Sequence, residues 1–403
     1  MKLASRLALV KPSATLAISN KAKQMQKEGI DVVDLGAGEP DFPTPPAICR
    51  AAEKAIAEGR TKYTPASGIV ELRKAVCDRF LKDNGILYQP DQVIVSGGAK
   101  HSIFNAVFAL CEEKDEVLIP APYWLSYPEM VRLAGAKPVI LETKEAKEFK
   151  IDPAQLRKAI RPKTKLLILN SPSNPTGVIY RQEELDEIAA IVLEKKIMVL
   201  SDEIYSEILF DGEKFASISK SDPKIAEYLI LVNGASKSYA MTGWRIGYLA
   251  APKVLATAIA DVQSHTTSNP SSIAQYAALA SLREPIPELE QMRKTFEERR
   301  NFVAARLNQF PRISFVEPQG AFYFFINVSK TGKPAHKVAE ELLDKAHVAA
   351  VPGEPFGSDG HIRISFATSQ ENLKKALERM EVYFSEVSGA KSGGPKSGRK
   401  VFV

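Results

Sequence analysis

Short apolar runs recur over the first two thirds of the chain, and stretches with helical spacing of apolar residues separate them. The runs lie near Val93, Val117, Lys165, Ile197, Leu229 and Arg245. Apolar runs that alternate with helical stretches are typical of α/β proteins in which helices cover a mostly parallel sheet. We therefore predict an α/β fold, in which the carboxyl ends of successive strands meet at one edge of the sheet.

The last third of the chain has a different pattern. Residues 290–384 contain a long stretch rich in Glu and Arg, apolar runs around 321–325 and 363–366, and a closing helical stretch. With 403 residues, 45% of them hydrophobic, the chain is long enough for two cores. The expected division is an N-terminal arm that completes the small domain (1–44), a large domain (45–289), the small domain (290–386) and a basic tail (387–403).

Lys237 is the strongest candidate for chemistry. It follows the apolar run 228–232, lies next to Ser236 and precedes Arg245 by eight residues. A partly desolvated lysine near other cations has a lowered pKa and can form an imine with an aldehyde. Arg245 is a rigid two-pronged donor for a phosphate, which the Ser236 hydroxyl would assist. This setting is typical of the Schiff-base lysine that anchors pyridoxal phosphate (PLP), although a lone lysine of this kind is more often a solvated loop residue.

Two further polar clusters support the prediction. Asn174 lies in a proline-rich turn after the run 165–170, and Asp202 and Tyr205 follow the run 196–201. A carboxylate can bind the protonated pyridine nitrogen, and the amide and phenol can reach the ring oxygen of the cofactor. Alone, an Asn-Pro turn is usually only a turn, and an aspartate after a strand is usually a helix cap. Three such clusters after successive strands indicate one ligand at the sheet edge.

The order of these motifs resembles that of the PLP fold-type I aminotransferases, and most of all the prokaryotic subgroup Ib aspartate aminotransferases. The resemblance spans about Pro12 to Phe384 and rests on Gly38-Glu39-Pro40-Asp41-Phe42, Lys62-Tyr63, Pro122-Tyr123-Trp124, Ser173-Asn174-Pro175-Thr176-Gly177, Ser201-Asp202-Glu203-Ile204-Tyr205, Ser236-Lys237 through Arg245, and Arg363-Ile364-Ser365-Phe366-Ala367. It implies a large domain with a mostly parallel seven-stranded sheet between helices, and a smaller α/β domain.

The resemblance also implies roles around the cofactor. Trp124 would stack on the pyridine ring, and Gly98, Ala99 and Lys100 would bring the start of a helix to the phosphate, where backbone N–H groups favour anions. Tyr63 would reach the phosphate site of a neighbouring subunit. We therefore expect a homodimer with shared active sites.

Substrate contacts are expected on the same grounds. Arg363 would bind the α-carboxylate, because its planar fork matches a carboxylate and keeps its charge. Gly38, Trp124 and Asn174 would also contact the substrate. A second carboxylate would be held by residues of two segments: Lys100, Lys11, Ser13 and Thr15. For Lys100 the alternative is a lysine at a helix start whose side chain lies in solvent.

The expected reaction is reversible transfer of an amino group between L-aspartate and 2-oxoglutarate, which gives oxaloacetate and L-glutamate. Some relatives with a Lys-Pro-Ser-Ala-Thr segment, as at residues 11–15, also transaminate prephenate, so a bifunctional enzyme stays open. A PLP-dependent lyase or decarboxylase on the same fold would keep Lys237, Asp202 and Arg245. A non-catalytic PLP-binding regulator would normally carry a DNA-binding domain, and the first 30 or so residues are too short for one.

Charge and cysteine content bear on the binding partners and the cellular compartment of the protein. The net charge is +6, but four basic residues and no acidic one lie in the last sixteen, so the basicity is mostly a Gly-, Ser- and Lys-rich tail that we expect to be disordered. Nothing indicates a nucleic-acid platform, a signal peptide or a membrane span. Cys49, Cys77 and Cys111 show no metal spacing, which fits a reducing, cytoplasmic location.

Overall fold

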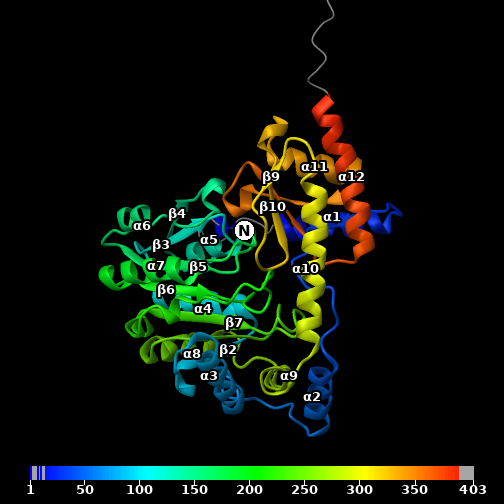
Figure 1. Ribbon diagram of the computed structural model, residues 1–403. Helices are drawn as coiled ribbons and strands as arrows, with labels where there is room; N and C mark the ends of the chain where they lie inside the picture. The colour runs from blue at the N-terminus through cyan, green and yellow to red at the C-terminus, as the bar shows by residue number, and fades with distance from the viewer. Residues whose placement is uncertain (2–6, 9, 11–13, 390–403) are drawn as a thin grey trace, which may run out of the picture.

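A computed structural model describes residues 1, 7–8, 10 and 14–389. Its centre is a seven-stranded sheet of order β2-β8-β7-β6-β5-β3-β4 (Figure 1). The strands are β2 (Val93–Ser96), β3 (Glu116–Ala121), β4 (Lys137–Glu142), β5 (Thr164–Asn170), β6 (Met198–Asp202), β7 (Leu229–Gly234) and β8 (Gly247–Ala250). Strand β8 pairs antiparallel with both of its neighbours, whereas the pairs among β3 to β7 are parallel. The prediction of a mostly parallel α/β sheet is confirmed.

Helices cover both faces of this sheet, and the strand sequences explain why. In β5, Leu166 and Ile168 face one core cluster while Leu167 and Leu169 face the other, as the two-residue period of a strand requires. One face is covered by α4 (Ala99–Leu110), α5 (Ser126–Leu133) and α8 (Lys253–Thr266). The other is covered by α3 (Val70–Asn84), α6 (Pro153–Ala159), α7 (Gln182–Lys195) and α9 (Ser272–Arg283), and α2 (Pro46–Ala57) packs outside α9.

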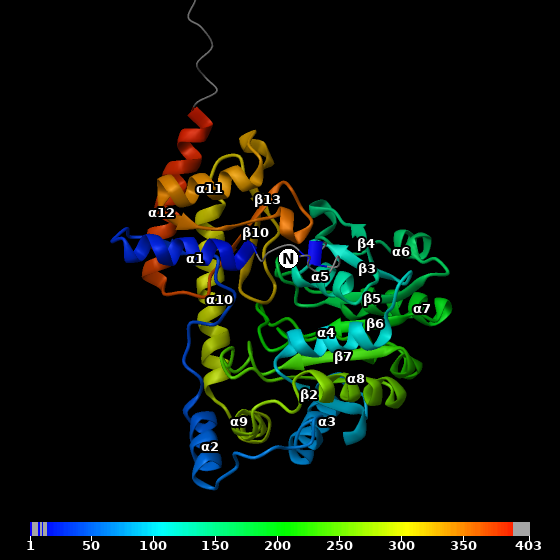
Figure 2. The ribbon, with the colours of Figure 1, turned by 180° about the vertical axis from the view of Figure 1, so that it is seen from behind.

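The second unit is built on a four-stranded sheet of order β12-β13-β10-β9, and β1 pairs with β11 beside it. Its strands are β1 (Val33–Asp34), β9 (Ser314–Phe315), β10 (Tyr323–Asn327), β11 (Val348–Ala349), β12 (Val351–Pro352) and β13 (His361–Ser365). Its helices are α1 (Ala14–Lys27), α10 (Glu288–Leu307), α11 (Ala335–Ala346) and α12 (Gln370–Gly389). In Figure 2, α1 lies across this unit, so the N-terminal segment and the last third of the chain form it together.

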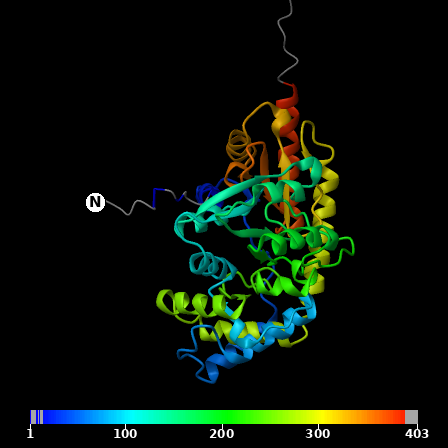
Figure 3. The same ribbon diagram turned by 90° about the vertical axis from the view of Figure 1, so that its left-hand side faces the viewer.

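The two units share α10, which runs from the helices below the large sheet to the smaller sheet above it. Figure 3 shows α10 and α12 along one side of the molecule. A loop after β4 also joins the units, because the Glu145 carboxylate accepts hydrogen bonds from Ser314 Oγ at 2.8 Å and Asn327 Nδ2 at 2.5 Å. Nearby, the Phe149 ring packs edge-on against Phe325. These contacts fix the smaller sheet next to the carboxyl ends of the larger one.

Three details differ from the sequence prediction. Strand β4 was not among the predicted runs, because Lys137 and Glu142 leave it little apolar signal. The strand expected near Arg245 begins two residues later at Gly247, and Arg245 itself has a positive φ of 58°. Helix α12 continues to Gly389, past the expected start of the tail at 387, and Val387 packs against the core. The remainder of the predicted tail, 390–403, lies outside the described residues.

Within the described ranges, no helix has the length and apolar character that crossing a membrane requires. The three cysteines are free thiols, with Cys77 and Cys111 buried and Cys49 partly buried.

Gly247 allows β8 to approach the start of α4, where a Cβ atom would collide with the backbone of Gly98 and Ala99. We expect Gly247→Ala to lower the free energy of unfolding by about 1–3 kcal/mol, because backbone cannot move aside as a flexible side chain can. Urea unfolding would measure the difference. Gly243→Ala is the matched control, since a Cβ there meets no atom within 4 Å. Equal unfolding of both variants and the wild type would contradict this account.

Candidate active site

A cavity of about 540 Å³ lies where the ends of β5, β6 and β7 meet α1, the start of α4 and the smaller sheet. It collects residues from distant parts of the chain because the carboxyl ends of parallel strands share one edge of a sheet. Twelve of the residues predicted from sequence line it: Thr15, Gly38, Ala99, Lys100, Trp124, Asn174, Asp202, Tyr205, Ser236, Lys237, Arg245 and Arg363.

Lys237 reaches this cavity from the loop after β7. Its Nζ donates a hydrogen bond to the backbone oxygen of Gly38 at 2.5 Å, so the segment that was expected to contact the substrate contacts the amine. Burial lowers the pKa of Lys237 to about 8, and the positive charges of Arg363 and Arg245 act in the same direction. About a tenth of the amine is therefore neutral and nucleophilic at pH 7, far more than for an ordinary lysine.

Asp202 ends β6 and is 3% exposed. Its Oδ2 accepts a hydrogen bond from Tyr127 Oη at 2.6 Å, and its Oδ1 accepts one from the backbone N–H of Ile204 at 3.3 Å. Burial raises the pKa of Asp202 to about 6, and the Tyr127 hydrogen bond and the nearby charge of Lys237 oppose that rise. The carboxylate is ionised above that pH and faces a cavity that contains a basic amine.

Asn170 and Tyr127 hold this carboxylate in place, and the sequence analysis did not single out either side chain. Asn170 Nδ2 donates to the backbone oxygen of Asp202 at 2.9 Å, and its Oδ1 accepts from the backbone N–H of Asn174 at 2.8 Å. Asn170 thus ties the turn that carries Asn174 to the end of β6. The only signal in the sequence was the polar residue that closes the apolar run of β5.

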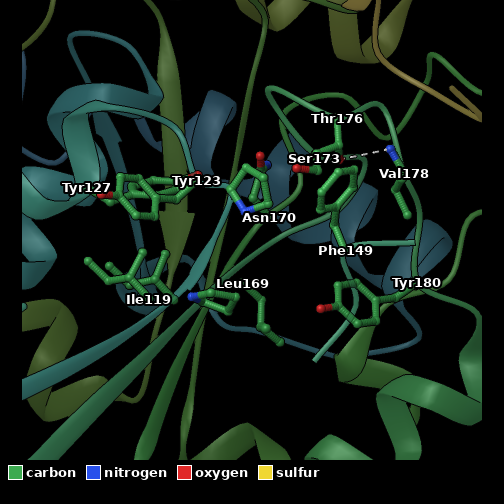
Figure 4. Close-up of a pocket in the computed structure, with 13 residues that line it drawn as sticks. Ile119, Tyr123, Tyr127, Phe149, Leu169, Asn170, Ser173, Thr176, Val178 and Tyr180 are labelled. Carbon is green, nitrogen blue, oxygen red and sulfur yellow. Dashed lines mark hydrogen bonds between the residues drawn. The ribbon is translucent and has the colours of Figure 1, made fainter. Parts of the chain in front are cut away.

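A second, small cavity of about 30 Å³ lies beside the first and shares Tyr127 and Asn170 with it. Figure 4 shows Tyr123 and Tyr127 on one side of it, Asn170 in the middle, and Phe149 and Tyr180 on the other side. Tyr127 and Asn170, which contact Asp202, therefore line both cavities.

Arg363 occupies the end of the cavity formed by the smaller sheet. It is 2% exposed; its Nη1 donates to Asn174 Oδ1 at 2.9 Å and its Nη2 to the backbone oxygen of Gly36 at 2.8 Å. Its guanidinium lies 4.4 Å from the centroid of the Tyr323 ring. Nε has no hydrogen-bond partner among the described residues. No acidic side chain pairs with Arg363 in the described part of the chain, so a buried cation is left facing the cavity.

Tyr323 links this arginine to Tyr205, because the two hydroxyl oxygens lie 3.0 Å apart. The sequence analysis placed Tyr323 within a strand of the small domain but gave it no role. Its ring separates Arg363 from the core of the smaller unit, where both tyrosines pack near Phe322. This pair therefore connects the Asp202 side of the cavity with the Arg363 side.

The start of α4 forms the opposite end. Gly98 has a φ of 95°, and a Cβ at this position would meet the Arg245 guanidinium, which donates to the backbone oxygen of Gly97 at 3.2 Å. Helix α4 has no side-chain cap at its N-terminus, so its first N–H groups are open to a ligand. With Ser236 and Arg245 alongside, this end of the cavity suits a phosphate.

Trp124 and Lys100 form another wall. The Trp124 ring meets Tyr127 edge-on with centroids 5.3 Å apart, and Lys100 Nζ lies 4.9 Å from the Trp124 centroid. Lys100 therefore stands at the rim over the aromatic ring. Thr15 lines the cavity from α1, and its buried Oγ1 has no hydrogen-bond partner among the described residues.

Among the described residues, two predicted positions, Gly98 and Tyr63, do not line the cavity of this chain. Tyr63 is 92% exposed and does not line it, so its expected role in a neighbouring subunit stays a prediction. Lys11 and Ser13 lie outside the described residues.

Comparison with known proteins identifies the family. The model of the family "Aminotransferase class I and II" matches residues 30–380. The chain belongs to this family. It is 46% identical to an aspartate aminotransferase of Bacillus subtilis over 96% of this chain and all of the relative. It is 44% identical to an aspartate/prephenate aminotransferase of Thermus thermophilus over 94% of this chain and 97% of the relative.

The solved structures agree with this assignment. The aspartate aminotransferase from Thermus thermophilus with maleate matches with a TM-score of 0.91 and 43% identity, over 95% of this chain and 99% of that one. The aspartate aminotransferase from Rhizobium meliloti matches with a TM-score of 0.92 and 39% identity, over 96% and 99%. This aminotransferase therefore shares its fold with these enzymes over nearly its whole length.

The cavity of this aminotransferase suits PLP. Four features required by that cofactor are present together: an open helix start with an arginine, a buried carboxylate, an aromatic wall and a lysine of lowered pKa. The close approach of Arg245 to Gly98, which leaves no room for a side chain, forms the cradle at the phosphate end.

The raised pKa of Asp202 gives a stability prediction for the cofactor-free protein. Its ordinary value of 3.8 becomes about 6 on folding, so the folded state holds the proton more tightly than the unfolded chain. Stability is therefore lost as pH rises from about 4 to 6, and the full loss persists above that range. We expect Asp202→Asn to be more stable than the wild type at pH 8 by about 1–3 kcal/mol, with a difference that shrinks toward pH 4.

Urea unfolding of cofactor-free protein at several pH values tests this expectation. Asp261→Asn on the exposed side of α8 is the control, and it should leave the pH profile unchanged. A gain that is the same at every pH would contradict a titrating Asp202.

Proposed function

We propose that this enzyme is an aspartate aminotransferase that transfers the amino group between L-aspartate and 2-oxoglutarate and uses PLP. The names of the relatives support aspartate as a substrate, since they are aspartate or aspartate/prephenate aminotransferases. The observation that carries the proposal is the convergence on one cavity of the Lys237 amine, the Asp202 carboxylate and the Arg363 guanidinium, which has no acidic partner among the described residues.

Each part of PLP has a suitable partner here. The phosphate would be held by Gly98, Ala99, Ser236 and Arg245, the ring face by Trp124, the ring nitrogen by Asp202, the ring oxygen by Asn174 and Tyr205, and the aldehyde by Lys237. When bound, PLP supplies an electron-withdrawing ring that makes the substrate α-carbon acidic. The negative charge of Asp202, in a site of low dielectric, would keep a proton on the ring nitrogen.

Lys237 has two tasks. Its neutral amine would hold the aldehyde of the cofactor, and when free of the aldehyde its Nζ would serve as the general base for the proton on the substrate α-carbon. A pKa of about 8 suits this second task, because a base near the working pH both accepts and returns the proton. The Gly38 backbone oxygen, which accepts from Nζ at 2.5 Å, limits where the amine can move.

Arg363 fixes the direction in which the substrate lies. Nη1 and Nη2 already bond Asn174 and Gly36, so the guanidinium is held rigidly and the α-carboxylate meets it without reordering the side chain. The second carboxylate of aspartate would lie toward Lys100 and Thr15, at the rim and the α1 wall. Lys100 stands over Trp124 at 4.9 Å from the ring centroid, a flexible point charge that suits both aspartate and the longer glutamate.

A bifunctional aspartate/prephenate enzyme is the second candidate. Relatives named for both activities are 42–44% identical to this chain. Thr15 lines the α1 wall of the cavity, where a larger dicarboxylate would extend. Turnover of prephenate with glutamate as donor, at a kcat/KM comparable to that for aspartate, would favour this alternative.

The first experiment is to load the enzyme with PLP and add L-aspartate while the visible absorption of the bound cofactor and the oxaloacetate formed are followed together. We expect the absorption band to decline with one oxaloacetate per site. Lys237→Ala should bind the cofactor without sustaining turnover. An unchanged band with aspartate would contradict the aspartate assignment, and full activity of Lys237→Ala would contradict the role of the amine.

Arg363→Lys tests the α-carboxylate contact. A lysine cannot reproduce the two-pronged geometry, so we expect kcat/KM for aspartate to fall by about 10- to 100-fold, mostly through KM. Arg299→Lys is a matched control, because Arg299 is also largely buried and makes a two-pronged pair with Asp41 but does not line the cavity. Steady-state kinetics that leave KM unchanged in the Arg363 variant would contradict its role.

The proposal includes a cytoplasmic homodimer in which Tyr63 acts in the site of the partner subunit. Inactive Lys237→Ala and weakly active Tyr63→Ala proteins, unfolded and refolded together, should then regain activity, because the mixed dimer contains one site with both residues intact. If Tyr63 served the site of its own chain, neither site would be complete and no activity would return. Sedimentation of each variant checks that both still form dimers.

A further inference from the structure

Glu203 is a buried carboxylate that the proposed mechanism does not use. It directly follows Asp202, is 1% exposed and does not line the active-site cavity. Successive residues at the end of a strand point to opposite sides, so the two carboxylates stand back to back across β6. The chain therefore places a second acidic group directly behind the one that faces the ring nitrogen.

The surroundings of Glu203 consist of neutral donors. Its Oε1 accepts from Ser217 Oγ at 2.6 Å and from Ser201 Oγ at 2.9 Å, and its Oε2 accepts from Asn84 Nδ2 at 2.7 Å. Ser219 closes the network, with its Oγ 2.8 Å from Ser217 Oγ and donating to the backbone oxygen of Asn84. No Lys, Arg or His forms an ion pair with Glu203 within the described ranges.

A structural role alone does not explain the charge at this position. A glutamine could accept from the same serines, with Asn84 turned over to match it, at no cost of burying a charge. Burial of a carboxylate among neutral groups is unfavourable unless a cation compensates it. Burial accordingly raises the pKa of Glu203 to about 7, and the negative charge of Asp202 adds to the effect. In the cofactor-free chain Glu203 is therefore close to half protonated at neutral pH.

We propose that Glu203 is a positioning residue for the cofactor: its negative charge, acting through Asp202, favours the protonated ring nitrogen of PLP. The inference rests on the proposed use of PLP. The cation that compensates the two carboxylates is then the ring N–H itself, on the far side of Asp202. The donors from Ser201, Ser217 and Asn84 hold Glu203 ionised when that cation is present.

The test compares PLP with its analogue that has carbon in place of the ring nitrogen, which can carry no ring cation. Affinity of each for cofactor-free protein is measured by fluorescence quenching. We expect Glu203→Gln to weaken PLP on the order of tenfold, the size expected for one charge acting over roughly 10 Å inside a protein, and to leave the analogue unchanged. Equal loss for both ligands, or no loss for either, would overturn the proposal.

Ser219→Ala is the matched control, because it removes hydrogen bonds of the same network and leaves all three donors to Glu203 in place. It should leave the ratio of the two affinities close to that of the wild type, and Glu203→Asp should restore most of the preference for PLP. A Ser219→Ala protein that loses the preference as fully as Glu203→Gln would show that the network and not the charge is responsible, which overturns the proposal. Thermal unfolding checks that each variant is folded.

A measurement on the wild type does not depend on any variant. With ¹³C-labelled glutamate at pH 7, the infrared band of a buried protonated glutamic acid should decline when PLP binds and persist when the analogue binds. A band that responds equally to both ligands would overturn the proposal. If the wild type binds neither ligand, the failure lies with the proposed use of PLP and not with Glu203.

Discussion

The arrangement of the active site depends on one constraint, which is that the Asp202 carboxylate must be buried and still ionised. Burial alone raises its pKa, and only the Tyr127 hydroxyl, the N–H of Ile204 and the charge of Lys237 oppose the rise. Tyr127 lies on α5, Ile204 follows β6, and Lys237 lies in the loop after β7. The seven-stranded sheet must bring these elements together for the buried carboxylate to remain ionised. The same burial lowers the pKa of Lys237, so one low-dielectric cavity adjusts acid and base in opposite directions, each toward neutral pH.

Each of the two units of the fold supplies one end of the cavity. The large sheet supplies the open start of α4 and the Arg245 guanidinium, both fixed close to backbone by Gly98 and Gly247. The smaller sheet supplies Arg363, held by Asn174 from the large unit and Gly36 from the N-terminal segment. The substrate end is therefore complete only when both units are docked, and Glu145 and Phe149 contribute to that docking far from any reacting atom.

The sequence predicted those parts of the site that lie at strand ends. Lys237, Asp202 and Asn174 each follow an apolar run, and the parallel sheet necessarily collects such positions at one edge. The sequence did not predict the roles of Tyr127, Asn170 and Tyr323, because each role is a contact between elements that are distant in the chain. The hydroxyl of Tyr127 on α5, for example, donates to the carboxylate at the end of β6. The edge strand β4 escaped for a local reason, since charged residues at both of its ends hide the apolar pattern. Local propensity identifies elements that are buried on both faces, and it fails where only tertiary packing decides.

The environment of the two adjacent carboxylates shows how the same residue type is used differently on the two faces of one strand. Asp202 has two donors and an open cavity before it, whereas Glu203 has three donors and no cavity. The donors around Glu203 could be satisfied by a neutral acceptor, so its negative charge adds no local stabilisation. The negative charge of Asp202, which faces the cavity, is stabilised most when a cation enters the cavity. The negative field at the end of β6 is thus set by the pair, and its strength depends on groups as distant as Asn84 at the end of α3. Electrostatic preorganisation of this kind depends on the packing of α3 and the Ser217 loop against the end of β6.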